Sequence, residues 1–414
     1  MKKYFFIVAA ALLALSSCTK VQETGSLDRE VGFQVANYAQ TKADGNDAAN
    51  ETAAANHVEF PKDESFTAYA WHTSPEGATT HRFSNQRVAY NRNAGVWTTV
   101  GNTYYWMKTG YDDFVCYAPY LEGSPEVTPN SITWGMSEPY YQVKMDGKDL
   151  MYADKALKQT GSNPGATTAT PVPVLFHHAL AKLSFQVKAN FLEYTNPDNQ
   201  QDKTTWEITL RSAKLSGIRD KGTLALTLPA NSTDGKWTLP TQKVTWTEGE
   251  QTKSLDAHVW TPDANSVLEP IELVPASQDG KAFVVTEEAQ PLYVGADGKA
   301  QSFYVLPQVL GASDPQNKDF AQQLTLDIHI KTTLPTEDEQ GNPRTFEEDY
   351  EATLDLKDVS SLKAWQMNQN ILYTIKIKPT ANDTTPDTPT DVLVTFDPAV
   401  AGWEPVTGDV NVQL

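Results

Sequence analysis

The side chains that could support acid–base or metal chemistry occur in three short clusters. Two histidines are adjacent at His177 and His178, and carboxylates are adjacent at Asp112–Asp113 and at 347–349. Adjacent strand residues point to opposite faces, so the histidine pair is a poor metal site, and we expect one buried, hydrogen-bonded histidine and one exposed histidine. Paired carboxylates can hydrolyse glycosidic bonds, but the turn-like surroundings of these acids are typical of solvated strand ends.

The sequence contains none of the motifs that assemble a catalytic site. It has no Gly-x-Ser-x-Gly, no glycine-rich phosphate loop ending in Lys-Ser or Lys-Thr, and no His-Glu-x-x-His. The run Asp44–Asp47 lacks the ligand spacing and the closing glutamate of a calcium loop. We therefore expect no enzymatic activity, no cofactor and no metal ion.

Cys18 stands in a context that favours covalent lipid attachment. Two lysines precede an apolar run at residues 4–15 that is too short for a stable membrane span. Small residues then precede the cysteine, an arrangement similar to the lipobox of bacterial lipoproteins. We expect residues 1–17 to be a signal peptide and the Cys18 thiol to be acylated. An ordinary secretory leader with an incidental cysteine is the alternative.

The composition excludes one class of partner and constrains how the mature chain is stabilised. The formal net charge is −19 at pH 7, and loss of Lys2 and Lys3 with the leader would make it −21. A chain this acidic lacks the basic face that nucleic-acid binding requires. The other cysteine, Cys116, lies among apolar residues, where we expect a buried and unreactive thiol. With Cys18 acylated, no intramolecular disulfide can form, so a hydrophobic core must hold the fold together.

Alternation of apolar and polar residues with a period of two predicts β-strands almost throughout the chain. The pattern is clearest at residues 183–187, 224–228, 324–330 and 371–377. Strands at this spacing predict an all-β protein built from two tandem β-sandwich domains. We expect only short helical pieces, near residues 149–157 and 360–368.

Polar stretches rich in Pro, Gly and Thr indicate how the chain is divided. We expect a tether and first strand at 18–42, an N-terminal sandwich at 43–180, a C-terminal sandwich at 181–379, and a linker with a last strand segment at 380–414.

Aromatic residues are concentrated between positions 97 and 111. Trp97, Tyr104, Tyr105, Trp106 and Tyr111 could stack on sugar rings, as in a glycan-binding surface protein. The interpretation we favour is that they form the core of the first domain and pair across strands.

Strand-like segments near both ends of the sequence are joined to the body by polar connectors. The alternating apolar residues are Val31, Phe33 and Val35 near the start, then Val392, Val394 and Phe396, and finally Val410, Val412 and Leu414. Both segments could fold back as ordinary edge strands. Alternatively, the first strand is removable and the last is donated to a neighbour, whose open groove it fills. Such a head-to-tail contact does not close on itself, so it builds a filament.

A series of short segments occurs in a characteristic order along the chain. They are the leader with Cys18, Glu30–Ala39, Thr41–Ala43, Trp97, Tyr104–Trp106, Phe114–Tyr120, Asp149–Ala153, Leu175–Leu183, Val305–Gln308, Trp365, Asn370, Tyr373, Phe396–Pro398 and Trp403–Glu404. In this order the chain resembles the fimbrillin family of Bacteroidales, the subunits of the lipoprotein-derived, strand-exchange pili called type V.

The resemblance implies transthyretin-like sandwich domains, export as an outer-membrane lipoprotein, and cleavage by a trypsin-like protease after the first strand. It also implies donor-strand exchange with copies of the chain or with related fimbrillins. The best studied relatives are cut after arginine, whereas this first strand is followed by Lys42. Arg29 precedes the strand, so cleavage there would release the lipid but keep the groove closed. We expect cleavage at Lys42, with Arg29 as the alternative.

The expected function is a structural subunit of a cell-surface fimbrium that supports adhesion. The precursor would be an outer-membrane lipoprotein, and the mature chain would lie in the fimbrium. The alternative is an outer-membrane lipoprotein that does not polymerise, namely a fimbrial anchor, a tip or a glycan-binding surface protein.

Overall fold

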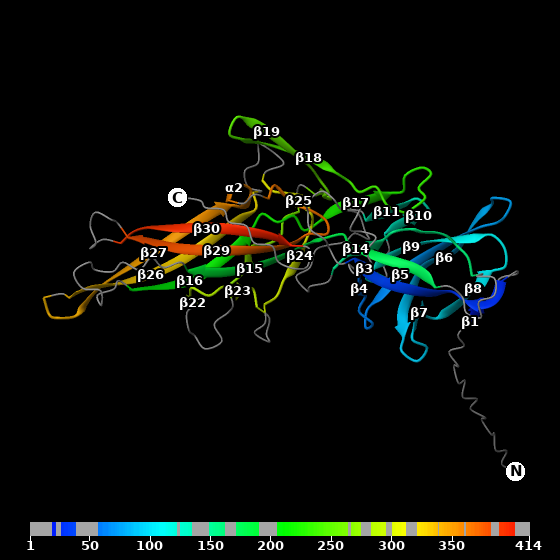
Figure 1. Ribbon diagram of the computed structural model, residues 1–414, viewed down its shortest axis with the longest axis horizontal. Coiled ribbons are helices and arrows are strands. Elements are labelled where there is room, and N and C mark those ends of the chain that lie inside the picture. Colours follow the sequence, from blue (N-terminus) through cyan, green and yellow to red (C-terminus); the bar gives the residue numbers. More distant parts are fainter. Residues whose placement is uncertain are drawn as a thin grey trace, which may run out of the picture.

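The chain forms a long and almost entirely β molecule (Figure 1). The computed structural model describes residues 19–21, 26–38, 57–121, 125–134, 149–161, 171–189, 205–263, 266–274, 283–294, 300–311, 321–337, 339–359, 362–381 and 389–401. The earlier part of the chain, blue to cyan in Figure 1, lies at one end, and the later part lies at the other. Within the described ranges the one helix is α2 (Leu356–Val359). The all-β prediction is therefore confirmed.

The helix expected near residues 149–157 is wrong, because strand pairing holds this segment on both sides. β12 (Met151–Ala153) pairs with β14 (Val172–His178) and with β9 (Tyr111–Ala118), and β13 (Ala156–Gln159) also pairs with β9. In the second expected region the structure has the short strand β28 (Ala364–Trp365), and α2 ends just before it.

Nine strands, drawn mainly from the earlier part of the chain, form one sheet. The order is β12-β14-β3-β7-β6-β5-β9-β13, with β4 paired to β3, and the pairing of β12 with β9 closes the strands into a ring. The remaining bounds are β3 (Gly32–Tyr38), β4 (His57–Glu59), β5 (Ser65–Thr73), β6 (Thr79–Asn91) and β7 (Val96–Thr99). Alternate side chains of these strands form one hydrophobic core, which includes Phe66, Phe114 and Phe176.

The strand β8 (Asn102–Met107) connects this sheet to the start of the described chain. It pairs in parallel with β1 (Thr19–Val21) and antiparallel with β2 (Ser26–Glu30). The turn from β8 to β9 depends on Gly110, whose φ is +74° and whose Cβ would lie 2.2 Å from the carbonyl oxygen of Thr73. No larger residue fits there without moving the backbone.

The middle of the molecule is a packed junction rather than an open linker. A four-stranded sheet takes strands from both parts of the chain, in the order β10 (Glu126–Thr128), β11 (Ser131–Trp134), β17 (Gly222–Thr227) and β20 (Thr261–Pro262). Trp134, Trp237 and Trp260 belong to one core there, and the Trp260 indole N–H donates to the Ala179 carbonyl at 2.8 Å. The domain boundary predicted at residue 180 falls inside this junction and stays a prediction.

The later part of the chain is a sandwich of two five-stranded sheets. One has the order β23-β15-β29-β30 with β24 on β15, and the other has the order β21-β16-β26-β27 with β22 on β16. Phe185 and Tyr373 of the first sheet share a core with Leu210 and Ile328 of the second. The bounds are β15 (Ala181–Ala189), β16 (Thr205–Ser216), β21 (Ile271–Glu272), β22 (Phe283–Val285), β23 (Gln290–Leu292), β24 (Phe303–Val305), β26 (Gln323–Glu337), β27 (Pro343–Asp355), β29 (Asn370–Ala381) and β30 (Pro389–Ala401).

Two small sheets complete the described structure. β18 (Gln242–Glu248) and β19 (Gln251–Ala257) form a hairpin that projects from the body in Figure 1, and β25 (Gln308–Val309) pairs with β28.

Candidate functional site: the position of strand β3

Strand β3 lies in the interior of the nine-stranded sheet, not at an edge. On one side it runs parallel to β14, with Phe33 opposite Val172 and Asn37 opposite Phe176. On the other side it is antiparallel to β7, with Phe33 opposite Trp97, and further along it is antiparallel to β4. Both of its backbone edges are therefore used, and without β3 the ring would be open between β14 and β7.

The apolar face of β3 is buried as the sequence pattern predicts. Phe33 and Val35 on β3 and Val31 directly before it are 3%, 9% and 2% exposed, whereas Gln34 is exposed. The Phe33 ring makes edge contacts with Phe66 and Phe114, at centroid distances of 5.6 and 5.8 Å. One aromatic residue thus occupies the middle of this position, with a valine two residues away on each side. We call the space taken by β3 between β14 and β7 the β3 slot.

The residues before β3 are attached to β8. The Val31 backbone N–H donates to the Tyr104 carbonyl at 2.8 Å, and β2 pairs with β8 just upstream. Arg29 lies on β2, where its guanidinium is half-buried and donates to the Gly161 carbonyl at 3.2 Å. A protease must draw an extended segment into its own cleft, so cleavage at Arg29 requires β2 to leave β8 first.

Two of the residues predicted to be processed lie outside the described ranges. These are Cys18, which directly precedes β1, and Lys42, which falls between β3 and β4. Since β3 ends at Tyr38 and β4 begins at His57, a cut at Lys42 would leave β4 on the body and all of β3 on the released segment.

The strand segment predicted near the end of the chain is partly described. β30 contains Val392, Val394 and Phe396, and its backbone pairs antiparallel with β29 from Pro389 to Ala401, as an edge strand of the protein's own sandwich. Val410, Val412 and Leu414 lie outside the described ranges. The predicted donor segment is therefore divided between a strand that pairs with its own body and the residues that follow it.

The histidine pair is held by two aspartates. His178 is buried and hydrogen-bonds through Nδ1 to Asp149, while His177 stacks on Tyr152 and lies 3.2 Å from Asp154. The prediction that one histidine of the pair is exposed is therefore wrong, because His177 is half-buried against the tyrosine ring. In the part of the chain that the structure describes, no group of three or more potential ligands could hold a metal ion.

The prediction that Asp112 and Asp113 are solvated is also wrong. Asp112 is 1% exposed and accepts from Arg82 Nη1 at 2.5 Å, and His72 Nδ1 lies 2.9 Å away. Burial raises the pKa of Asp112, while Arg82 and His72 oppose part of that rise. Asp113 pairs with Lys155 at 2.9 Å. Both carboxylates are therefore paired with cationic side chains, Asp112 with Arg82 and Asp113 with Lys155.

The aromatic group between 97 and 111 is mainly core, as we favoured. Trp97, Tyr104 and Trp106 are buried, and Tyr105 and Tyr111 are half-buried. No stacking platform for a sugar remains on the three buried rings.

Cys116 is also buried, and desolvation raises the pKa of its thiol.

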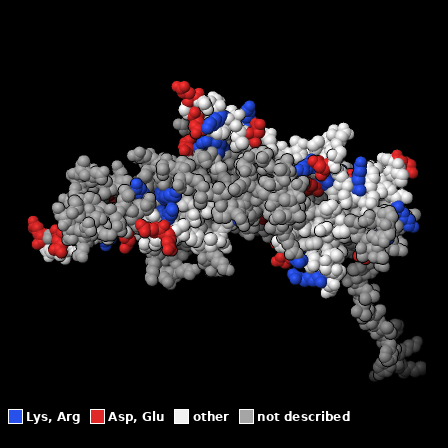
Figure 2. Space-filling model, in the orientation of Figure 1, with Lys and Arg blue, Asp and Glu red and all other residues white. Residues whose placement is uncertain are grey.

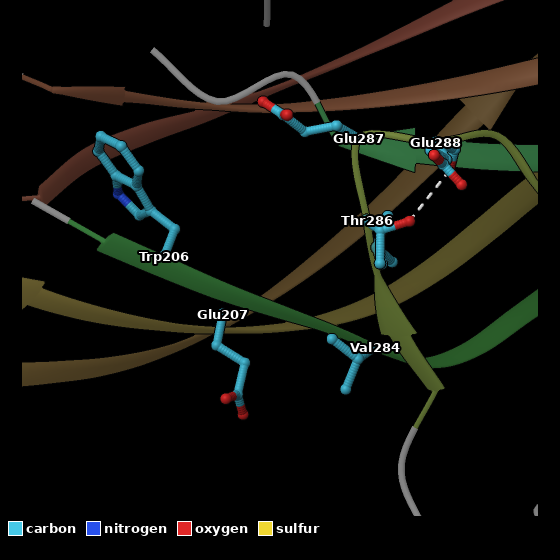
Figure 3. A pocket seen from close by; sticks show the side chains of 7 residues that line it. Trp206, Glu207, Val284, Thr286, Glu287 and Glu288 are labelled. Atoms are coloured by element: carbon cyan, nitrogen blue, oxygen red, sulfur yellow. Dashed lines mark hydrogen bonds between the residues drawn. The ribbon is translucent and has the colours of Figure 1, made fainter. Parts of the chain in front are cut away.

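The sandwich has an open hollow of about 520 Å³ beside β16 and β22 (Figure 3). Trp206 and Glu207 are neighbours on β16 and point to opposite sides of it, and the Thr286 hydroxyl donates to the Glu288 carbonyl at 3.2 Å. Glu207, Glu287 and Glu288 are all exposed to solvent. The side chains do not converge on one point, so this hollow is a weaker candidate than the β3 slot.

Charge is spread over the surface in Figure 2, with acidic side chains at the outer ends of the β26–β27 and β18–β19 hairpins. The free edge of the second sheet is acidic too, because Glu347, Glu348 and Asp349 are exposed along β27. Charges of this kind discourage other strands from pairing with an edge. Among the described residues, no helix has the length and apolarity needed to cross a membrane.

Sequence reasoning missed the walls of the β3 slot. The backbone of β14 at Val172–Phe176 and of β7 at Trp97–Thr98 contacts β3, yet neither was singled out as a partner. The alternation of Val172, Val174 and Phe176 is the signal that could have identified β14, although it cannot reveal which strand lies beside it.

Comparison with known proteins gives a consistent result. A sequence model described as fimbrillin-like matches residues 41–403. No curated protein matches the chain. Similar solved structures are proposed cell adhesion proteins from Bacteroides uniformis ATCC 8492 (17% identity, TM-score 0.41, 91% of this chain and 99% of that chain) and Bacteroides ovatus ATCC 8483 (12%, 0.36, 94% and 99%). Another is the fimbrial anchor protein Mfa2 from Porphyromonas gingivalis (12%, 0.26, 92% and 100%). At these TM-scores the structural similarities carry no argument about function.

Proposed function

The chain belongs to the fimbrillin-like family, a family of fimbrial structural and adhesion proteins rather than of enzymes, and we propose that it is a polymerising subunit of a cell-surface fimbrium. The precursor is anchored in the outer membrane by lipid on Cys18. A trypsin-like protease cuts it at Lys42, and the segment carrying β3 leaves. A strand from a neighbouring subunit then fills the β3 slot.

The observation that carries this proposal is the interior position of β3. A strand at an edge could be lost with little effect on the sheet, and its loss would create no groove. β3 has a partner on each side, and Phe33 and Val35 on it and Val31 just before it are buried, so its departure exposes two backbone edges and an apolar trough. Unpaired edges and empty apolar sites of this kind are what a donated strand fills.

The position of Lys42 in the sequence supports it as the processing site. A cut between β3 and β4 separates the slot from its occupant, whereas a cut at Arg29 leaves β3 joined to β4. Arg29 is also protected by the pairing of its strand β2 with β8 and by its hydrogen bond to the Gly161 carbonyl. Cleavage at Lys42 would release lipid, β1, β2 and β3 together.

In this proposal the polymer persists because its subunits dissociate slowly. A donated strand held on both sides dissociates only when its ladder bonds and its buried side chains are lost together, which makes release slow. Filaments of this kind resist detergent at temperatures at which weaker contacts between folded surfaces dissociate.

The test is limited digestion of the purified full chain with a trypsin-like protease, followed by gel electrophoresis in detergent without boiling. We expect ladders of regular spacing and a new N-terminus at Ala43. The variant Lys42→Gln should remain a monomer, and its matched control Arg29→Gln should still form ladders. Trimmed protein that stays monomeric at high concentration would contradict polymerisation and favour a lipoprotein that does not assemble.

A further inference from the structure

Strand β8 is paired with the segment that the proposed cut releases. Among the described strands it forms a three-stranded sheet in the order β1-β8-β2, at the outer end of the earlier part of the chain (Figure 1). Residues 102–104 of β8 pair with β1, and residues 105–107 lie against β2. Both outer strands precede Lys42, whereas β8 follows it in the chain. Release of the segment therefore leaves β8 on the body without either of these strand neighbours.

Two aromatic side chains of β8 pack against residues that stay on the body. The ring centroids of Trp106 and Phe114 are 5.8 Å apart, and Gly161 fits so closely that a Cβ there would lie 2.2 Å from Trp106 Cγ. The Tyr104 and Phe83 ring centroids are 4.4 Å apart. The buried Trp106 indole N–H has no hydrogen-bond acceptor among the described residues, so this side chain holds β8 by packing alone.

A buried guanidinium binds the backbone of β8 directly. Arg82 on β6 donates through Nη2 to the Tyr105 carbonyl at 2.6 Å and through Nη1 to Asp112 at 2.5 Å. The Arg82 and Asp112 side chains are 3% and 1% exposed. The other carboxylate oxygen of Asp112 lies 2.9 Å from Nδ1 of His72, on β5. One hydrogen-bonded network thus joins β8 to three strands that remain after the cut, namely β5, β6 and β9.

Resting on the proposed function, we infer that Arg82, oriented by Asp112, is the positioning residue that keeps β8 on the body after β1 and β2 have left. Hydrogen bonds from a charged donor are stronger than neutral ones, and burial shields this one from water. A buried ion pair adds little stability in itself compared with packed apolar residues. Its role here is to fix the Tyr105 carbonyl, and with it the strand, once the ladder bonds on both sides are gone.

The residue directly after β8 shows why the position of this strand matters. Lys108 is exposed and has the same side chain as Lys42, so the trypsin-like protease of the proposed function can recognise both. A protease draws an extended segment into its cleft, so cleavage after Lys108 requires β8 to leave the body. In the untrimmed chain, pairing with β1 and β2 prevents this. In the trimmed chain Arg82 takes over that role, and the protease cuts at Lys42 without dividing the mature body.

A double variant removes the network without leaving a charge buried. Arg82→Met with Asp112→Asn deletes the bond to the Tyr105 carbonyl, and its neutral side chains avoid an unpaired carboxylate inside the protein. The matched control is Lys155→Met with Asp113→Asn, an ion pair of 2.9 Å at the next residue of β9. Arg82→Lys is a milder variant, because it keeps a charge beside Asp112 but lacks the second arm of the guanidinium.

Each variant is digested with a trypsin-like protease at a concentration at which trimmed chains remain monomeric, and mass spectrometry measures the cuts after Lys42 and Lys108. In the natural chain we expect the cut after Lys108 to be much slower than the cut after Lys42. The double variant should speed the Lys108 cut roughly tenfold, and Arg82→Lys should speed it by less. The control pair should change it by less than about twofold. In a Lys42→Gln background, where β1 and β2 stay, all these chains should be cut equally slowly after Lys108.

Other results contradict the inference. Equal Lys108 cleavage in the trimmed natural chain and the trimmed double variant would mean that Tyr104 and Trp106 hold β8 without Arg82. Faster cleavage in the control pair, or in the double variant in the Lys42→Gln background, would mean that such ion pairs stabilise the whole sheet rather than β8 after trimming. Rapid Lys108 cleavage in the natural chain would mean that β8 leaves with its neighbours. A chain that is not cut at Lys42, or that keeps the cleaved segment bound on size exclusion, would instead overturn the proposed function itself.

Discussion

Strands β3 and β30 lie near opposite ends of the described chain, and the protein holds them differently. β3 has a neighbour on each side and buries Phe33 and Val35, with Val31 buried just before it, although its pairing with each neighbour covers only a few residues. β30 has one neighbour, but it is paired with β29 over almost its whole length. An interior strand with short pairings can leave a groove that another strand fits. A long edge strand can leave without opening the sheet.

Because β3 is an interior strand and β30 an edge strand, we expect the largest loss of unfolding free energy from a substitution at the centre of β3. Phe33→Ala should lower the free energy of unfolding of the untrimmed chain by about 3–5 kcal/mol, because it removes a buried ring that packs against two others. Gln34→Ala, one residue away on the exposed face, should change it by less than about 0.5 kcal/mol. Denaturant unfolding monitored by tryptophan fluorescence measures both. Equal effects of the two substitutions would mean that β3 is not packed as described.

We expect a smaller loss of unfolding free energy from a substitution on β29, the strand that pairs with β30. The Trp365 indole N–H donates to the Tyr373 hydroxyl at 2.8 Å inside the sandwich, and Tyr373 lies on β29. Tyr373→Phe keeps the ring but leaves a buried N–H without that acceptor, so we expect a loss of about 1–3 kcal/mol in unfolding free energy. The rate of trimming at Lys42 should not change. A changed trimming rate would show that the sandwich around β29 and the segment carrying β3 are coupled, which would contradict their independent treatment.

The next effect concerns the attachment of the segment before β3. Arg29→Gln removes a charged hydrogen bond to the Gly161 carbonyl, worth about 1 kcal/mol. After the cut at Lys42, release of the cleaved segment should be about fivefold faster than in the natural chain, as followed by size-exclusion chromatography. Unchanged release would show that Arg29 does not hold the segment in place.

The smallest effect on stability is expected at the free edge of the second sheet. Glu348 is exposed on β27, so Glu348→Val should change the unfolding free energy by less than about 0.5 kcal/mol. The same change removes a charge from an exposed strand edge and should increase unspecific association, measured by light scattering of the untrimmed chain. A chain that stays dispersed would mean that other features protect this edge.

The sequence predicted the strands better than their partners. Alternation at Val31, Phe33 and Val35 depends on local residues, and it correctly identified a strand and its buried face. The burial of Asp112 was missed, because the side chains that bind its carboxylate, Arg82 and His72, lie 30 and 40 residues away in the chain. Residues 149–157 were expected to be helical because short apolar segments fit either structure, and only the pairing of β12 with β9 and β14 decides it.

The β3 slot could not be predicted either, because its walls are strands that lie far from β3 in the sequence. That β3 lies between β14 and β7 depends on contacts across more than 130 residues of chain on one side and more than 60 on the other. Local patterns give no information about such neighbours.

Hydrogen–deuterium exchange at β14 and β7 tests the central claim most directly. In the untrimmed chain, the amides of residues 172–176 and 97–98 that face β3 should exchange slowly. After trimming of a chain that lacks residues 409–414, they should exchange much faster, and adding a trimmed chain with an intact tail should restore protection. Amides that stay protected in the trimmed, tail-less chain would mean that β3 does not leave or that the sheet closes without it, and the account would be wrong.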